Sequence, residues 1–271
     1  MRCDTKYPLL LVHGVGFHDW KAFNYWGRIP RALQEQGAVI LYGEQDSWAT
    51  VEYNADILKN NLNKYLAELK CQKVNIIAHS KGGLESRYII SSLGMARNVA
   101  SLTTVATPHH GSKTIDLICK LPRCSLKFAG VFVNAYFRLL GDKKPDFFAV
   151  IHGLKTASMR EFNAKNPDCP DIYYQSYAAV MKNPFSDMIM CAPNFIVGLT
   201  EGENDGLVSA ASAEWTNFKG VLRNASRRGV SHKDVVDFSR RPLAKKKQNN
   251  AVTDIRDFYI EMVAGLKDMG F

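Results

Sequence analysis

The feature that most constrains the fold is the stretch from Val74 to Leu84, which reads VNIIAHSKGGL. It begins as a β-branched, apolar run typical of a buried parallel strand, and after a short turn its apolar residues continue at helical spacing. A serine at the tip of such a strand-to-helix turn adopts strained backbone angles and needs small residues two before and two after it. Ala78 and Gly82 stand at those positions around Ser80. The stretch therefore predicts a nucleophilic serine, although a serine in an ordinary loop also fits the five-residue pattern.

The first half of the chain alternates predicted strands with predicted helices. Beside the run before Ser80, we expect strands at 7–12, 38–42 and 102–106 and helices at 20–36, at 54–69 and after Ser80. Such alternation is typical of an α/β fold with a mostly parallel central sheet and helices on both faces. Functional sites in these sheets form outside the carboxyl ends of the strands. Ser80 lies at that edge, as does the HGVGF turn at 13–17, whose backbone N–H groups either bind an oxyanion or simply connect strand to loop.

The alternation breaks in residues 113–165. This segment is more apolar and aromatic than a connecting loop should be. We expect it to form an inserted helical lid or cap within a single domain that spans 1–271. The apolar inner face of such a cap would line an acyl-chain pocket and would meet a lipid interface, whereas ordinary core helices are the alternative.

Two further polar residues lie in loops late in the chain. Strand character returns at 171–180 and at 194–199, after which Asp205 stands in a glycine-punctuated loop and His232 precedes a predicted final helix at 253–269. A serine hydroxyl is a poor nucleophile unless an imidazole takes its proton and a carboxylate orients that imidazole. Ser80, Asp205 and His232 follow one another in the order nucleophile, acid, histidine, and so predict a catalytic triad.

Taken together, the motifs resemble the bacterial triacylglycerol lipase family of the α/β-hydrolase fold. The matching segments are PLLLVHG at 8–14, AHSKGGLESRY at 78–88, TPHHGS at 107–112, NDGLVS at 204–209 and SHKD at 231–234. The combination is specific, although no single motif is. The resemblance implies that Ser80 is the nucleophile, Asp205 the orienting acid and His232 the general base and then the general acid.

The resemblance also implies an oxyanion hole made of two backbone N–H groups. One belongs to Lys81, directly after the nucleophile, and the other to Val15, directly after His13 and Gly14. The turn is one residue shorter than the common form in the family, so Gly16 is an alternative second donor. Each donor in comparable enzymes lowers the barrier by about 3–4 kcal/mol.

A metal ion is the other feature that the resemblance raises. Many relatives carry a structural calcium near the catalytic histidine, with an Asp two residues after it as a ligand. Asp234 matches that position, and Asp187 is a loose candidate for its partner, while a capping or ion-paired Asp234 is the alternative. His109 and His110, in the loop that leads to the cap, could bind a metal, but no paired ligand spacing supports this. We expect His79 to pack or to hydrogen-bond beside the sheet.

Composition narrows the partners and the compartment. The net charge is +9, but the densest basic run, 240–247, has no interleaved aromatic residues for base stacking, so we expect a solvated loop and no nucleic acid. The six cysteines form no CxxC pair, and only Cys119 and Cys124 are close enough for a local disulfide. With no recognisable signal peptide at the start, the expected compartment is the cytoplasm, or the exterior if the start has been trimmed.

The sequence thus predicts a serine ester hydrolase, a lipase or carboxylesterase, that cleaves acyl esters with apolar acyl chains through an acyl-enzyme intermediate. It requires no cofactor. The partners expected are an acyl ester or glyceride and a transient lipid interface, and the sequence does not indicate an oligomeric state. An acyltransferase, a thioesterase or a polyester depolymerase would use the same triad, and a non-catalytic binding protein of the same fold is the alternative from another class.

Overall fold

A six-stranded parallel sheet is the centre of the computed structural model, which describes residues 1–20, 24–224, 228–244 and 252–271. The strands are β1 (Leu9–Val12), β2 (Ile40–Tyr42), β3 (Val74–His79), β4 (Val99–Val105), β5 (Tyr173–Ala179) and β6 (Phe218–Leu222). Their order is β2-β1-β3-β4-β5-β6, and every neighbouring pair is parallel. The chain moves outward from β1 to β2 and then returns to β3 on the other side of β1. Sites in such sheets form at this reversal, so the ends of β1 and β3 are the expected place.

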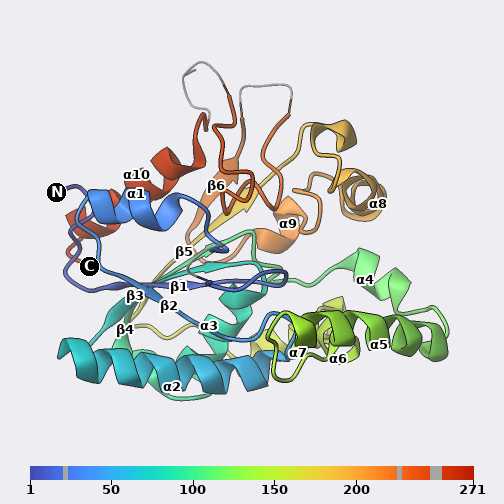
Figure 1. Cartoon of the computed structure of the whole chain (residues 1–271), viewed down its shortest axis with the longest axis horizontal. Coiled ribbons are helices and arrows are strands. Elements are labelled where there is room, and N and C mark those ends of the chain that lie inside the picture. The colour runs from blue at the N-terminus through green and yellow to red at the C-terminus, as the bar shows by residue number, and fades with distance from the viewer. Residues whose placement is uncertain (21–23, 225–227, 245–251) are drawn as a thin grey trace.

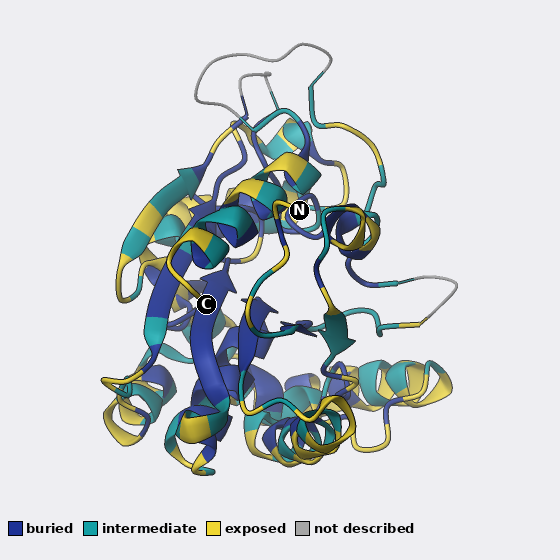
Figure 2. Ribbon diagram, turned by 90° about the vertical axis from the view of Figure 1, so that its left-hand side faces the viewer, coloured by how far each residue is buried: buried dark blue, intermediate teal, exposed yellow. Residues whose placement is uncertain are grey.

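The period of two along each strand divides the core into two layers. Leu9, Leu11 and Ile77 pack on the face that is covered by α1 (Ile29–Glu35) and α10 (Ile255–Asp268). The alternate residues of the same strands pack on the other face, against α2 (Val51–Leu69) and α3 (Lys81–Ser91). Figure 1 shows these helices above and below the sheet, and Figure 2 shows the central strands buried. The predicted α/β-hydrolase fold is confirmed.

Segment 113–165 lies between β4 and β5 and is entirely helical apart from its turns. Its helices are α4 (Lys113–Ile118), α5 (Arg123–Leu139), α6 (Phe147–Gly153) and α7 (Thr156–Lys165). They lie beyond the carboxyl end of the sheet in Figure 1, and we call this segment the cap. Among the described residues, no helix is both long and apolar enough to cross a bilayer.

Two local predictions were wrong, and one strand was not predicted. The expected strand at 194–199 belongs to α8 (Cys191–Glu201), in which Asn194 and Val197 face inward while Phe195, Ile196 and Leu199 are exposed, the three-to-four residue period of a helix. The first helix begins at Ile29 instead of Trp20, with Pro30 in its first turn, and residues 21–23 lie outside the described part. The short edge strand β6, interrupted by a glycine, was not predicted.

The remaining short elements are η1 (Met95–Asn98), η2 (Pro184–Ser186) and α9 (Ala210–Ala213). All six cysteines are free thiols, so the local disulfide between Cys119 and Cys124 is not formed. The basic run at 240–247 extends past residue 244 into a segment outside the described residues.

Candidate active site

Ser80 stands at the tip of the turn between β3 and α3, with φ 53° and ψ −131°. A side chain in this region of backbone space is strained. Its N–H donates to the carbonyl of Val105 at 3.1 Å, which ties the turn to β4. Close packing explains the glycines nearby: a Cβ on Gly82 would lie 2.4 Å from the His13 carbonyl oxygen, and one on Gly14 would lie 2.6 Å from the Cβ of Ser80. The HGVGF turn is therefore packed directly against the serine turn.

Asp205 and His232 come from two loops that the fold brings into contact. The Nδ1 atom of His232 lies 2.7 Å from Oδ2 of Asp205, and the backbone N–H of His232 donates to the Asp205 carbonyl at 2.7 Å. The other carboxylate oxygen, Oδ1, accepts hydrogen bonds from the N–H groups of Leu207 and Val208 at 3.0 and 2.8 Å. The Asp205 side chain is almost fully buried, so this carboxylate is fixed in one orientation toward the imidazole.

The imidazole of His232 lies at the edge of the sheet where Ser80 stands. Its ring centre is 4.4 Å from that of His79, the neighbour of Ser80 in the chain. Both Ser80 and His232 are only 6% exposed. Asp205 is therefore in direct contact with His232, and His232 packs beside His79, the residue that precedes Ser80 at the carboxyl end of β3.

Comparison with known proteins places the chain in a family. The chain is 30% identical over 262 residues to a triacylglycerol lipase of Vibrio cholerae, which covers 86% of this chain and 80% of the relative. The chain belongs to the triacylglycerol lipase family. It is also 28% identical to triacylglycerol lipase 2 of Saccharomyces cerevisiae, over its full length and 78% of that protein. A search of protein-family models gave no match.

Solved structures agree on the fold. A metagenomic carboxyl esterase superposes with a TM-score of 0.73 at 19% identity, covering 97% of this chain and 76% of the esterase. The Staphylococcus hyicus lipase superposes with a TM-score of 0.68 at 15% identity, covering 98% of both chains. Together with the lipase relatives, these findings make the protein a carboxylic ester hydrolase of the serine type.

The predicted oxyanion donors differ in whether their backbone N–H groups already have a hydrogen-bond acceptor. The N–H of Gly16 already donates to Oγ of Ser47 at 2.5 Å. Within the described part of the chain, by contrast, the N–H groups of Val15 and Lys81 have no acceptor at hydrogen-bond distance. The side chain of Lys81 is held elsewhere, because its ammonium pairs with Glu85 and donates to the Ala49 carbonyl at 3.0 Å. This geometry favours Val15 over Gly16 as the second donor.

His79 is engaged beside the sheet. Its Nδ1 lies 2.8 Å from the hydroxyl of Tyr25, a buried residue next to the HGVGF turn. Burial, with smaller contributions from His232 and His13, holds the pKa of His79 well below its usual value, so the ring is neutral at neutral pH. The uncharged ring of His79 thus packs against the ring of His232.

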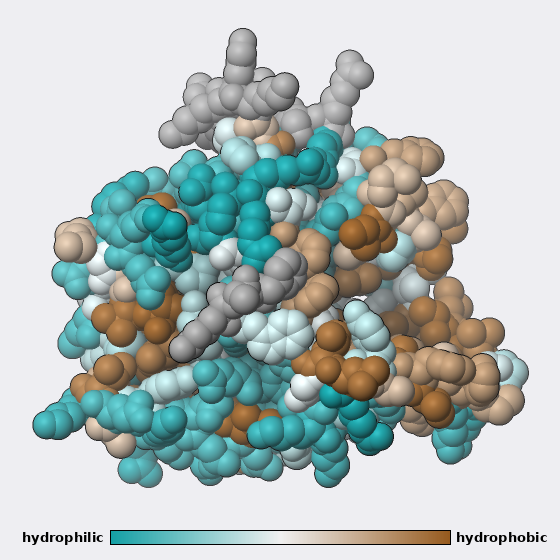
Figure 3. All heavy atoms as spheres, in the orientation of Figure 1, coloured by the Kyte–Doolittle hydropathy of each residue, from teal (hydrophilic) through white to brown (hydrophobic). Residues whose placement is uncertain are grey.

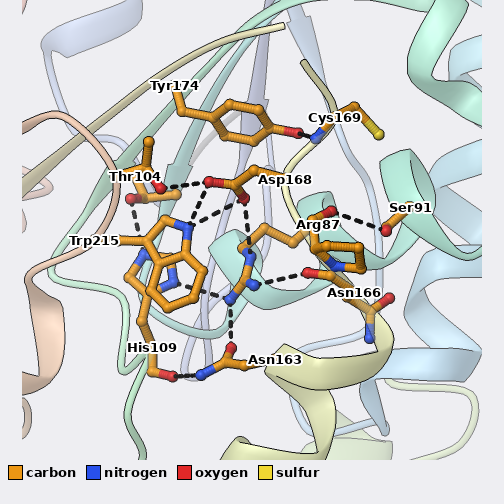
Figure 4. A network of polar contacts seen from close by, with 12 residues as sticks. Arg87, Ser91, Thr104, His109, Asn163, Asn166, Asp168, Cys169, Tyr174 and Trp215 are labelled. Carbon is orange, nitrogen blue, oxygen red and sulfur yellow. Dashed lines mark hydrogen bonds and ion pairs between the residues drawn. The ribbon is translucent and has the colours of Figure 1, made fainter. Parts of the chain in front are cut away.

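His109 is part of a buried network around Arg87, which sequence reasoning did not anticipate (Figure 4). The Arg87 guanidinium lies 4.0 Å from the ring centre of Trp215, on which His109 is also stacked. Hydrogen bonds to Asn163 and to the Asn166 carbonyl, at 2.8 and 2.9 Å, tie Arg87 to the end of α7. Burial lowers the pKa of Arg87 to about 10, and the guanidinium keeps its charge. The network fastens the cap to the helix that follows Ser80.

Within the described residues, His109 and His110 make hydrogen bonds outside any cluster of metal-ligating side chains. His109 bonds Thr104 at 3.0 Å, burial lowers its pKa far below the usual value, and Nε2 of His110 lies 3.1 Å from the Glu214 carbonyl. Among the described residues, no group of three or more His, Cys, Asp and Glu side chains is arranged to hold a metal ion.

The candidate calcium ligands are occupied by other partners. Oδ2 of Asp187 lies 3.1 Å from the Lys233 ammonium and accepts from the Ser231 hydroxyl at 3.0 Å, while its Oδ1 accepts from two backbone N–H groups. Burial alone would raise the pKa of Asp187, but Lys233 and Ser231 outweigh it and lower that pKa. Asp234 accepts from the N–H of Ser231 at 3.2 Å, a contact within a turn. These residues do not fit calcium, because a divalent cation at Asp187 would lie against the ammonium.

The two other acids of the Asp205 loop are committed to structural contacts. Glu201 accepts from the hydroxyls of Ser112 and Ser209 at 2.6 and 2.9 Å and joins the start of the cap to α8. Glu203 forms an exposed ion pair with Arg223. Asp205 is therefore the acid that the fold brings to His232.

Proposed function

We propose that Ser80, His232 and Asp205 hydrolyse acyl esters as a nucleophile, a proton carrier and an orienting acid. The observation that carries this proposal is the 2.7 Å contact between Asp205 and Nδ1 of His232, at the edge where the strained Ser80 turn ends. A carboxylate on Nδ1 fixes the proton there and leaves Nε2 as the acceptor for the serine proton.

The steps follow from this tautomer. Oγ of Ser80 attacks the carbonyl carbon of the ester while its proton passes to Nε2 of His232. The tetrahedral intermediate collapses, the alcohol leaves with that proton, and the acyl group stays on Ser80. Water then attacks the acyl-enzyme, again giving its proton to His232, and the carboxylic acid is released as the proton returns to Ser80. The N–H groups of Val15 and Lys81 are proposed to stabilise the oxyanion in both steps.

The surface around the cap supports apolar acyl chains as the substrate. Of twenty exposed large apolar side chains among the described residues, eight lie within 117–139 and six within 185–199. Figure 3 shows apolar surface over α8 and over α4 and α5, on the two sides of an indentation. We propose esters with apolar acyl chains, including glycerides, which are the substrates that the names of the relatives indicate.

Labelling and a chain-length series test this function. A fluorophosphonate probe is expected to modify Ser80, located by mass spectrometry, and kcat/KM for p-nitrophenyl esters is expected to rise from acetate to longer acyl chains. No labelling of the folded protein would favour the non-catalytic binding protein. Labelling with no preference for longer chains would exclude the apolar acyl pocket while leaving the ester hydrolase.

The cap is also proposed to dock on an anionic lipid surface. Residues 113–165 contain ten Lys and Arg and four Asp and Glu, so this segment carries +6 of the net charge of +9. Within the described residues, none of its exposed cations on α5 or beside it lies within ion-pair distance of a carboxylate: Lys120, Arg123, Lys127, Arg138, Lys143 and Lys144. Unpaired cations beside an exposed apolar helix face are typical of interfacial binding.

Charge removal tests this surface. Changing Lys120, Arg123 and Lys127 to Gln is expected to weaken binding to vesicles rich in phosphatidylglycerol by roughly a hundredfold, because each basic residue near such a surface contributes about 1 kcal/mol. The control is the same loss of charge at Lys64, Lys70 and Lys73, at the end of α2 and after it. Sedimentation with vesicles measures both. Equal binding of wild type to neutral and anionic vesicles would contradict the proposal.

We further propose that hydrolysis and folding need no calcium. Dialysis against EDTA is expected to leave kcat and the melting temperature unchanged, because the Lys233 ammonium neutralises Asp187. Lys233→Gln is expected to lower the melting temperature, since it leaves a buried carboxylate without its cation. The exposed Lys182→Gln is the control. A melting temperature that falls in EDTA and recovers with added calcium would show a metal site.

A further inference from the structure

The loop 45–48, at the carboxyl end of β2, lies between the cap and the HGVGF turn. Two buried aspartates join it to the cap turn 142–146, between α5 and α6. Asp142 of the cap accepts hydrogen bonds from the N–H groups of Ser47 and Trp48, at 2.7 and 2.8 Å. Asp46 of the loop accepts from the N–H groups of Lys143 and Lys144, both at 2.7 Å. The two segments therefore clasp each other through reciprocal contacts.

Asp142 is held as a carboxylate. Its side chain is fully buried, and Nε2 of His18 lies 3.0 Å from its Oδ1, at ion-pair distance but poorly aligned for a direct hydrogen bond. Burial alone would raise the pKa of Asp142, but His18 and the two N–H donors outweigh it and lower that pKa. An anion at this point satisfies two N–H groups that would otherwise be buried without partners.

The opposite side of the same loop contacts the HGVGF turn at two points. Oγ of Ser47 accepts the hydrogen bond from the N–H of Gly16. Gln45 donates to the His13 carbonyl at 2.9 Å, and Nε2 of His13 lies 3.0 Å from the Gln45 carbonyl. Val15, the proposed oxyanion donor, stands between these two anchored residues. The direction of its N–H therefore depends on where the loop holds Ser47.

We propose that Asp142, in the cap, is a positioning residue. Through Ser47 it fixes the conformation of the HGVGF turn, which carries the proposed oxyanion donor Val15. The inference rests on the proposed function, in which Val15 donates to the oxyanion. Asp142 touches no reacting atom, and its contribution is to fix the backbone of Ser47, whose hydroxyl in turn fixes Gly16. A cap displaced from this position would leave the triad intact and the oxyanion hole incomplete.

The variant Asp142→Asn tests this coupling with little change in shape. An amide has one acceptor oxygen in place of the two of the carboxylate, so its NH2 group would face one of the two N–H donors. We expect kcat for a soluble short-chain ester, p-nitrophenyl butyrate, to fall by about tenfold or more while KM changes little, because the loss concerns the transition state. A boronic acid inhibitor, which forms a tetrahedral adduct, should lose affinity in parallel.

The matched control is Asp146→Asn, in the same cap turn, where the carboxylate caps α6 at an exposed position. Its kcat is expected to stay within about twofold of wild type. Ser47→Ala is the second variant, and it should lower kcat on its own. In the double variant Asp142→Asn with Ser47→Ala, the two effects on kcat should be clearly less than multiplicative, because both act through one hydrogen bond.

Three outcomes are distinguishable. The coupling is supported if the wild type is active, each single variant has a reduced kcat, and the reduction in the double variant is clearly less than the product of the two single reductions. If Asp142→Asn lowers only the melting temperature or raises only KM for long-chain esters, Asp142 is an anchor of the cap and the proposal is overturned, as it is if Ser47→Ala leaves kcat unchanged. A wild type without esterase activity or fluorophosphonate labelling would instead reject the proposed function.

Discussion

Ester hydrolysis is expected to fall by roughly a millionfold in kcat when Ser80 is replaced by alanine, the loss typical of a missing nucleophile in a serine hydrolase. The physical reason is that no acyl-enzyme forms, and the oxyanion donors alone give only weak residual catalysis. Alanine keeps the Cβ, so the strained turn is retained and the fold should be unchanged. Fluorophosphonate labelling should disappear together with the activity.

Ser91→Ala is the matched control for this prediction. Ser91 is the last residue of α3, the helix that follows Ser80, and its hydroxyl donates to the Pro167 carbonyl away from the catalytic edge. Its kcat is expected to stay close to wild type. Activity retained in Ser80→Ala at the same level, with circular dichroism confirming the fold, would remove Ser80 from the mechanism.

Asp205→Asn is expected to lower kcat by about ten-thousandfold. The asparagine oxygen would keep accepting from the N–H groups of Leu207 and Val208, which directs its NH2 group toward Nδ1 of His232. An imidazole that must accept a hydrogen bond at Nδ1 carries its proton on Nε2. His232 in that tautomer has no lone pair for the proton of Ser80.

The control for this second prediction is Glu203→Gln, two residues earlier in the chain, which removes only an exposed ion pair with Arg223. It should cost less than about twofold in kcat, because surface ion pairs contribute little. The pair of variants is measured with the same p-nitrophenyl ester. If Glu203→Gln were the damaging change and Asp205→Asn the mild one, the orienting acid would have to be reassigned.

The parts of the site that local sequence determines were predictable. The small residues around Ser80 and the glycines of the HGVGF turn are needed wherever a chain makes these turns. Their pattern in the sequence therefore predicts the local backbone geometry. Asp205 and His232 were predicted to lie in loops that follow Ser80 in the chain, and the parallel sheet brings loops of this kind to one edge. The sequence could therefore predict that Asp205 and His232 lie close together, without the distance between them.

The parts that depend on distant side chains were not predictable. Nothing local indicates that Lys233 pairs with Asp187, that Arg87 lies between Trp215 and the end of α7, or that Asp142 accepts from Ser47. The short apolar run in α8 also fits a strand, because six residues do not distinguish the two periods. In the structure this run is helical, and its apolar residues Phe195, Ile196 and Leu199 remain exposed.

The position of the cap determines which part of the chain can change in length or composition without altering the sheet. The cap leaves and rejoins the body between β4 and β5, where the N–H of Ser112 donates to the Leu154 carbonyl at 3.0 Å, so that α4, α5 and α6 form a loop closed at its base. Changes of length or composition inside that loop need not alter the register of any strand. Under the proposed function, the substrate range can thus change while the hydrolytic centre stays constant, and a remodelled cap would still have to make the contacts of Asp142 with loop 45–48.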